Sequence, residues 1–328
     1  MLKDSLIEED EKEFSLEVDS IIPNIWLPNK AYGFKQIPST ESIVFKNATV
    51  WTNEEEGVLE NADVAIKDGK ILAVGKDLQR NELFENEELV RSIDANGKHI
   101  SCGIIDEHAH IGITKGVNES SHAVTAEVRI GDVINPTDIN LYRQLSGGVT
   151  VSQLLHGSAN PIGGQSALIK LRWGSNAEQM KIENADGFIK FALGENVKQS
   201  NWGDYNKIRY PQTRMGVEQV FYDAFYRARK YKLEWDLYNA MPNSMKRKEK
   251  APREDLQLNA LVEILESERF ITCHSYVQSE INMLMHVADS MDFTVNTFTH
   301  ILEGYKVADK MKKHGAGGST FSDWWAYK

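Results

Sequence analysis

From residue 103 onward, short apolar runs alternate with stretches of helical periodicity, and this alternation limits the folds open to the chain. Strands that alternate with helices usually pair in parallel through helical crossovers. The pattern predicts an α/β fold, a TIM-like (β/α)8 barrel of which about seven strands are present. Strands are expected at residues 103–108, 149–155, 166–172, 187–193, 270–274, 295–299 and 317–321, and helices at residues 137–146, 214–232, 254–266, 278–291 and 303–314.

The chain divides into three parts by texture. Residues 1–42 are acidic and then punctuated by prolines, so we expect an extended lead-in that packs on another part of the protein. Residues 43–102 are rich in short β patterns, and Asp68-Gly69 is a strong hairpin signal. We therefore predict a small β-unit ahead of a barrel that occupies residues 103–328.

Composition excludes several classes of partner. The net charge of −11 argues against a nucleic acid or an acidic membrane, because both bind basic surfaces. No apolar run approaches the length of about 20 residues that spans a bilayer, and the first residues do not have the pattern of a signal peptide. Cys102 and Cys273 do not form a disulfide framework. A cytoplasmic protein is the expectation.

The stretch GIIDEHAHIGI, residues 103–113, holds two carboxylates and two histidines in an apolar run. Asp106, His108 and His110 share parity on an extended strand, so they point to one side and Glu107 points to the other. Two imidazoles at this spacing can bind one metal ion, with Asp106 as a brace. Alone, such a pair is better explained by chance.

Two more histidines follow apolar strands far down the chain. His274 ends RFITCH, and His300 ends VNTFTH. In a parallel barrel the carboxyl ends of the strands meet on one face, so His108, His110, His274 and His300 are expected at one mouth. Four imidazoles there favour a metal site, and imidazole suits zinc and its first-row neighbours.

A lysine within an apolar strand needs an explanation. Lys190, in DGFIKFALGENVK, either extends outward past the helices or faces the barrel centre. In the second case it is a candidate metal ligand as a carbamylated lysine. Glu195, at the end of the same strand, is the rival ligand. The residues alone leave both open.

The segment QLLHGSANPIGGQSALIKLRWG, residues 153–174, is a candidate for substrate binding. Gly163 and Gly164 allow a tight turn with exposed backbone amides, which could hold a carboxylate or carbonyl. His156 ends a strand and could reach the site, and Arg172 could hold an anion. A packed turn with a structural histidine is an equally good interpretation.

Taken together, these residues resemble the metal-dependent amidohydrolase superfamily over nearly all of residues 43–328. The motif GKHISCGIIDEHAHI is the most specific, and the stretches GGVTVSQLLHGSANPIGGQ, IKFALGENVK, CHSY, FTHILEGYKVAD and TFSDWWAYK resemble the imidazolonepropionase-related subgroup. The resemblance implies that residues 43–102 are the N-terminal half of a flanking β-sandwich. It also implies one or two divalent metal ions, zinc first among them.

The resemblance assigns ligands residue by residue. His108 and His110 match the ligands on the first barrel strand, and His274 and His300 match those on the fifth and sixth. Lys190 lies on the fourth strand, where many members carry a carbamylated bridging lysine, although Glu195 stays an alternative.

One family feature has no match. Members use an aspartate on the eighth strand as a metal ligand and general base, and here it would lie beyond Lys328, since Asp323 comes too early. We therefore expect a chain truncated before the eighth barrel strand, with no catalytic residue assigned. An open barrel has unpaired strand edges, so a missing C-terminal segment or a homo-oligomer is expected to cover them.

The expected reaction is hydrolysis of a C–N bond in a small amide, a cyclic amide or a peptide-like substrate, by metal-activated water. The chain alone is expected to be weakly active or inactive. The alternative is a non-catalytic metal-binding or assembly fragment of a larger or split protein. A phosphotriesterase-like or deaminating activity is a third interpretation, because fold does not fix substrate.

Overall fold

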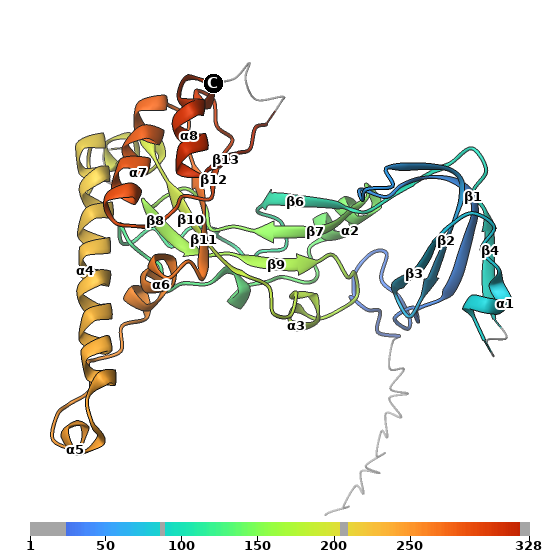
Figure 1. Cartoon of the computed structure of the whole chain (residues 1–328), viewed down its shortest axis with the longest axis horizontal. Coiled ribbons are helices and arrows are strands. Elements are labelled where there is room, and N and C mark those ends of the chain that lie inside the picture. Colours follow the sequence, from blue (N-terminus) through green and yellow to red (C-terminus); the bar gives the residue numbers. More distant parts are fainter. Residues whose placement is uncertain (1–23, 86–88, 204–208, 322–328) are drawn as a thin grey trace, which may run out of the picture.

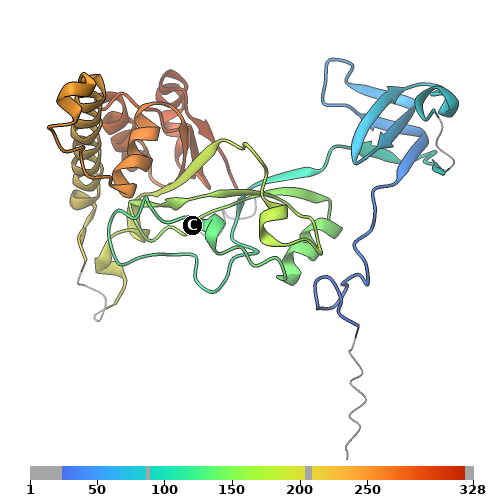
Figure 2. The ribbon, with the colours of Figure 1, turned by 90° about the horizontal axis from the view of Figure 1, so that it is seen from below.

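The computed structural model describes residues 24–85, 89–203 and 209–321 (Figure 1). The described residues form two parts, which lie along the length of the molecule. An N-terminal sheet lies at one end, and a larger α/β part that carries the long helices lies at the other (Figures 1 and 2). Among the helices of these residues, none has the length and apolar character needed to cross a bilayer.

The N-terminal sheet has the order β3-β2-β1-β4, with β5 also paired to β1. Strands β2 and β3 form the expected hairpin, since Lys67 pairs with Lys70 and both Asp68 and Gly69 have positive φ. The pairings of β1 with β4 and β5 are parallel, so the unit is more than a series of hairpins. Its elements are β1 (Ser42–Trp51), β2 (Val58–Lys67), β3 (Lys70–Gly75), α1 (Arg80–Leu83), β4 (Val90–Asp94) and β5 (His99–Ser101).

The described part of the lead-in packs on the α/β part. Leu27 and Phe34 bridge each other and close a small loop. Within it, the ring of Tyr32 stacks on Tyr142 at 4.6 Å, and the indole of Trp173 donates to the Tyr32 carbonyl over 2.9 Å. These contacts attach the segment to the α/β part.

The α/β part contains two sheets, and the described strands do not form one continuous ring. One sheet has the order β6-β7-β9 and the other β13-β12-β11-β10-β8. Strands β6 and β7 are parallel, as are β10 to β13, which agrees with the predicted crossovers. The strands are β6 (Ile104–Ala109), β7 (Val149–Leu154), β8 (Ile162–Gln165), β9 (Ala167–Lys170), β10 (Gly187–Ala192), β11 (Arg269–His274), β12 (Thr297–Thr299) and β13 (Gly317–Gly318).

Two strands run against the expected direction. Strand β9, expected as a parallel barrel strand at residues 166–172, is antiparallel to β7. Strand β8 is antiparallel to β10 and occupies the stretch predicted to be a turn. A parallel return needs a crossover of about a dozen residues or more, usually helical. The residues between β7 and β9 form no helix and contain β8, so the chain folds back on itself instead.

Most of the helices lie at the positions expected from the sequence. Helices α4, α6 and α7 lie beside the β8–β13 sheet (Figure 1), and their apolar side chains form one core with it, including Phe191, Phe221, Phe225 and Ile271. Helix α4 extends eight residues beyond its predicted end. The longer helices are α2 (Ile139–Ser146), α4 (Arg214–Ala240), α6 (Leu256–Leu265), α7 (Gln278–Ser290) and α8 (Ala308–His314); α3 (Ala177–Met180) and α5 (Asn243–Lys246) are single turns.

One edge of the β6-β7-β9 sheet carries exposed apolar side chains. Among the described strands, β6 pairs only with β7. Ile104 is 58% exposed and Ile105 is 68% exposed, although both lie within an apolar run. The exposed side of β6 is therefore an apolar surface.

Gly163 tests the packing of β8. A Cβ at this position would lie 2.8 Å from Nδ1 of His156 and 3.0 Å from the Lys190 carbonyl oxygen. Gly163→Ala should therefore lower the free energy of unfolding by about 1–3 kcal/mol, the usual cost of overpacking. Gly131→Ala is the matched control, because its Cβ would meet nothing closer than 3.6 Å. Urea denaturation measures both, and equal effects would contradict this account of β8.

Candidate metal centre

Four histidines from three strands gather at the carboxyl ends of those strands. His108 lies near the end of β6, His110 follows it, His274 ends β11, and His300 follows β12. The ring centroid of His108 lies 5.2 Å from those of His110 and His300, and the rings of His274 and His300 are 4.3 Å apart. The structure thus brings together the residues that the strand-end pattern selects.

Lys190 joins this group from β10. Its side chain is completely buried, and Nζ lies 3.4 Å from Nε2 of His108. In the register of the sheet Lys190 pairs with Thr272 of β11, the strand that ends in His274. The lysine therefore faces the site, and the alternative in which it extends outward past the helices is not what the structure shows.

Burial keeps these groups neutral. Burial and, secondarily, the charge of Lys190 lower the pKa of His108 to about 2. The same two causes lower the pKa of His110. Burial lowers the pKa of Lys190 to about 7, against the opposing influence of Cys273 and Glu107. Near neutral pH the imidazoles of His108 and His110 are thus uncharged, which is the form that binds a metal ion.

The donor set fits a divalent metal in its chemistry. Nδ1 of His110 lies 3.0 Å from the Leu155 carbonyl, so it carries the proton and leaves the lone pair on Nε2. A backbone bond of this kind orients a ligand histidine. Asp106 accepts from the His108 backbone N–H over 3.1 Å, which supports its predicted role as a brace.

The histidines are close, but they are not arranged around a single point. Within residues 24–85, 89–203 and 209–321, no three His, Cys, Asp or Glu side chains are placed to hold one ion as they stand. The rings contact one another instead, and Nε2 of His108 meets the amine of Lys190. Binding an ion would require changes of side-chain torsion at this mouth.

Glu107 does not point away from the site, contrary to the alternation expected of β6. Its Oε1 accepts from Thr299 over 3.3 Å and also from the Ser319 hydroxyl. The pairing of β6 with β7 is irregular between Asp106 and Ala109, so strict alternation fails there. Thr299 also contacts His108, so two hydrogen bonds through Thr299 connect the Glu107 carboxylate to a candidate ligand.

Glu195, the rival ligand, is engaged elsewhere. It lies in the 3-10 turn η2 (Gly194–Asn196) after β10. Its carboxylate pairs with Lys198 at 3.0 Å and with Arg214 at 2.5 Å. Two cations, Lys198 and Arg214, thus hold this carboxylate, whereas Lys190 lies beside His108.

The predicted substrate residues are also placed differently. Gly163 and Gly164 lie buried in β8, so they do not form a turn with exposed amides. Nε2 of His156 accepts from the Glu119 N–H over 2.8 Å and Nδ1 lies 2.8 Å from the Gly157 carbonyl, which commits both ring nitrogens to backbone. His156 therefore supports its loop.

Arg172 lies at the wrong end of its strand for a role at the histidines. Strand β9 is antiparallel to β7, so Ala167 pairs with Leu154 near the histidines and Lys170 pairs with Val151 at the far end. Arg172 follows Lys170, is exposed, and donates to the Gln179 carbonyl over 2.9 Å. Asp323, which the sequence places too early to be the family's aspartate, lies outside the described residues.

Two aromatic residues that the sequence does not single out complete the mouth. The ring of Tyr276 lies 4.5 Å from that of His274 and 5.3 Å from that of His300. Phe321 lies 5.4 Å from both His108 and His300. Burial raises the pKa of Tyr276, so its phenol stays protonated and can donate. Its position two residues after His274 was a usable signal.

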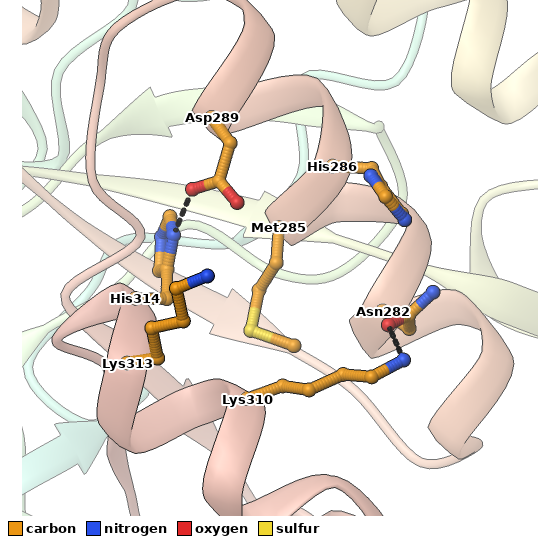
Figure 3. Close-up of a pocket in the computed structure, with 7 residues that line it drawn as sticks. All are labelled: Asn282, Met285, His286, Asp289, Lys310, Lys313 and His314. Carbon is orange, nitrogen blue, oxygen red and sulfur yellow. Dashed lines mark hydrogen bonds and ion pairs between the residues drawn. The ribbon is translucent and has the colours of Figure 1, made fainter.

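A separate pocket lies between α7 and α8 (Figure 3). It has a volume of about 380 Å³ and is lined by His286, Asp289, Lys310, Lys313 and His314, with Asn282 and Met285. Its polar groups largely bond within the pair of helices: His314 with Asp289 at 2.7 Å and Lys310 with Asn282 at 2.6 Å. None of the four strand-end histidines lines it, so it is not the candidate centre.

Comparison with known proteins gives relatives of one kind. No protein-family model matches the chain. Amidohydrolase tasK of Hapsidospora irregularis is 26% identical over 306 residues, which cover 84% of this chain and 31% of that protein. The amidohydrolase from Thermotoga maritima MSB8 has a similar structure, with a TM-score of 0.72 and 28% identity over 85% of this chain and 70% of that one.

Shorter matches do not single out a subgroup. The imidazolonepropionase of Geobacillus sp. (strain WCH70) is 36% identical over 69 residues, 20% of this chain and 16% of that protein. The L-hydantoinase of Paenarthrobacter aurescens is likewise 36% identical over 69 residues, 21% of this chain and 13% of that protein. The chain spans less than a third of each curated relative's length.

The lowered pKa of Lys190 predicts a pH dependence of stability. Its pKa is about 7 in the folded protein and 10.5 as the ordinary value, so between these pH values only the unfolded chain binds the proton. Raising the pH through this window should stabilise the folded protein relative to Lys190→Met, by up to about 1.4 kcal/mol per pH unit. Urea denaturation of metal-free, CO2-depleted protein between about pH 7 and 9.5 measures the difference in unfolding free energy between the two proteins.

Lys115→Met, at an exposed loop position, is the control for the loss of one lysine. Its unfolding free energy should follow that of the original protein at every pH. Parallel curves for the original protein and Lys190→Met would show that Lys190 is not held neutral by burial.

Proposed function

We propose that this chain, which is related to amidohydrolases in sequence and in fold, is part of a metal-dependent hydrolase that acts on C–N bonds. The observation that supports this most strongly is the gathering of His108, His110, His274 and His300 beside the buried amine of Lys190. The relatives support the reaction class, and the finer assignment to the imidazolonepropionase-related subgroup stays part of the proposal.

The four histidines would hold one or two divalent ions, and zinc suits a set of neutral imidazoles best. A bound ion supplies hydroxide at neutral pH and polarises a carbonyl. The chain's own contribution is to keep the imidazoles of His108 and His110 uncharged through burial and to orient His110 through the Leu155 carbonyl. Tyr276, protonated and beside His274 and His300, can donate to a substrate oxygen.

Lys190 would act as a carbamate in this proposal. Near neutral pH a large fraction of its amine is uncharged, so the nitrogen lone pair can add to CO2. The nitrogen then loses a proton and the product is a carbamate anion with two oxygen donors. This change would replace the amine that now faces Nε2 of His108 by an anionic group whose oxygens can bind a metal ion.

The substrate class is a small cyclic or peptide-like amide. A site lined by imidazole and aromatic rings suits such a neutral, planar group better than a large polyanion. The exposed Ile104 and Ile105 on the β6 edge support a contact with another polypeptide, either a further segment or a second copy. That partner is part of the proposal.

The second candidate function is metal binding without turnover. The carboxylates nearest the histidines, Asp106 and Glu107, accept hydrogen bonds from the backbone and from two hydroxyl groups. We assign neither carboxylate as the general base that hydrolysis needs. We therefore expect metal binding by this chain to be separable from hydrolysis, with weak or no turnover alone.

Metal analysis tests the proposal directly. After chelation, zinc reloading and gel filtration, the protein should retain one or two ions. His108→Asn should lower the zinc affinity by at least about 10-fold, because one imidazole ligand is lost. His286→Asn, on the exposed face of α7, is the control and should bind as the original protein does.

Hydrolysis of a panel of hydantoins, imidazolones and dipeptide amides is measured on the same samples. Zinc-dependent hydrolysis supports the hydrolase, and retained zinc without hydrolysis supports the binding module. If the original protein retains no metal, or if His108→Asn binds as tightly as the original, both functions are wrong.

A further inference from the structure

The contact between β6 and β12 contains a chain of three hydrogen-bonding groups. Oγ1 of Thr299 lies 2.9 Å from Nδ1 of His108 and 3.3 Å from Oε1 of Glu107. Thr299 is completely buried, and these residues are 191 or 192 positions apart in the sequence. No solvent competes at this threonine, so its single hydroxyl proton has a defined choice of acceptor.

The carboxylate decides that choice. An ionised carboxylate only accepts, whereas an imidazole nitrogen either donates or accepts. A hydrogen bond to a carboxylate is also the stronger, charge-assisted kind. The Thr299 hydroxyl therefore donates to Glu107, and its oxygen lone pair is left to accept from Nδ1–H of His108.

This direction fixes the tautomer of His108. With the proton on Nδ1, Nε2 carries the lone pair, and Nε2 is the atom that faces Nζ of Lys190 at 3.4 Å. The opposite direction would put a proton on Nε2 and point an N–H bond into the centre of the site. Such a histidine could not bind an ion there without first losing that proton.

A second hydroxyl holds the carboxylate in place. The Ser319 hydroxyl donates to the same Oε1 of Glu107. Ser319 itself is pinned to the neighbouring strands, because its N–H donates to the Phe298 carbonyl over 2.9 Å and its carbonyl accepts from Ile301 over 3.0 Å. Glu107 is thus held by two hydroxyl groups, and of these two the Thr299 hydroxyl also contacts His108.

We propose that Thr299, oriented by Glu107, is a positioning residue that sets the proton of His108 on Nδ1 and so presents the Nε2 lone pair to the site before any ligand binds. The role of this lone pair as a metal ligand rests on the proposed function, but the tautomer does not. The proposal extends the site to residues that neither strand-end position nor ligand type selects.

The tautomer is measured directly on the full, metal-free chain labelled with ¹⁵N at histidine. Two-bond proton–nitrogen spectra show which ring nitrogen carries the proton, and His108→Asn assigns the signal. The original protein should show His108 protonated at Nδ1. Thr299→Val, which keeps the shape and removes the hydroxyl, should lose this single tautomer, whereas Thr299→Ser should keep it.

Ser319→Ala is the matched control. It also removes a hydroxyl bonded to Glu107, but none bonded to His108, so the tautomer should be unchanged. Circular dichroism confirms that each variant is folded. In a zinc titration, Thr299→Val should bind about 10–100-fold more weakly than the original protein and Thr299→Ser about equally.

The outcomes separate the two proposals. His108 protonated at Nε2 in the original protein overturns the positioning role, even if zinc binds. A single Nδ1–H tautomer that persists in Thr299→Val overturns it as well. The predicted tautomer with no retained zinc upholds the role of Thr299 and contradicts the proposed function instead.

Discussion

The contact between the buried amine of Lys190 and the imidazole of His108 is the constraint on which the rest of the site depends. It joins β10 of one sheet to β6 of the other across the interior. Burial disfavours the ammonium form of Lys190 more than the nearby Glu107 favours it, so its pKa falls to about 7. The same desolvation keeps His108 uncharged. Two groups that would repel as cations can therefore share one space, and both have lone pairs.

Much of the α/β part is predictable from the sequence, because its signals are local. Strands β6, β7, β10 and β11 and helices α6 and α7 begin and end within two residues of the predicted bounds. Each is an apolar run of the right length or a helical pattern between turn residues, so its neighbours in the chain largely determine it. The four histidines could be selected for the same reason, since each lies in or directly after such a run.

The errors arise where a partner distant in sequence determines the outcome. Gly163 and Gly164 have the composition of a turn, but β10 pairs with that stretch and His156 packs against it, so it becomes a strand. Glu195 has the right residue type beside a strand end, but Arg214 and Lys198 attract its carboxylate. Composition identifies what a residue can do, and the nearest opposite charge decides what it does.

Glu107 shows the same limit within the most specific motif of the chain. Alternation on a regular strand would direct it away from His108, but the irregular register of β6 turns it toward Thr299 and Ser319. Those partners are 192 and 212 residues distant, so no local pattern could contain them. A motif can supply two imidazoles at the right spacing. The proton that decides whether one of them offers a lone pair is set by the Thr299 hydroxyl of β12, which reaches the motif only when the sheets have assembled.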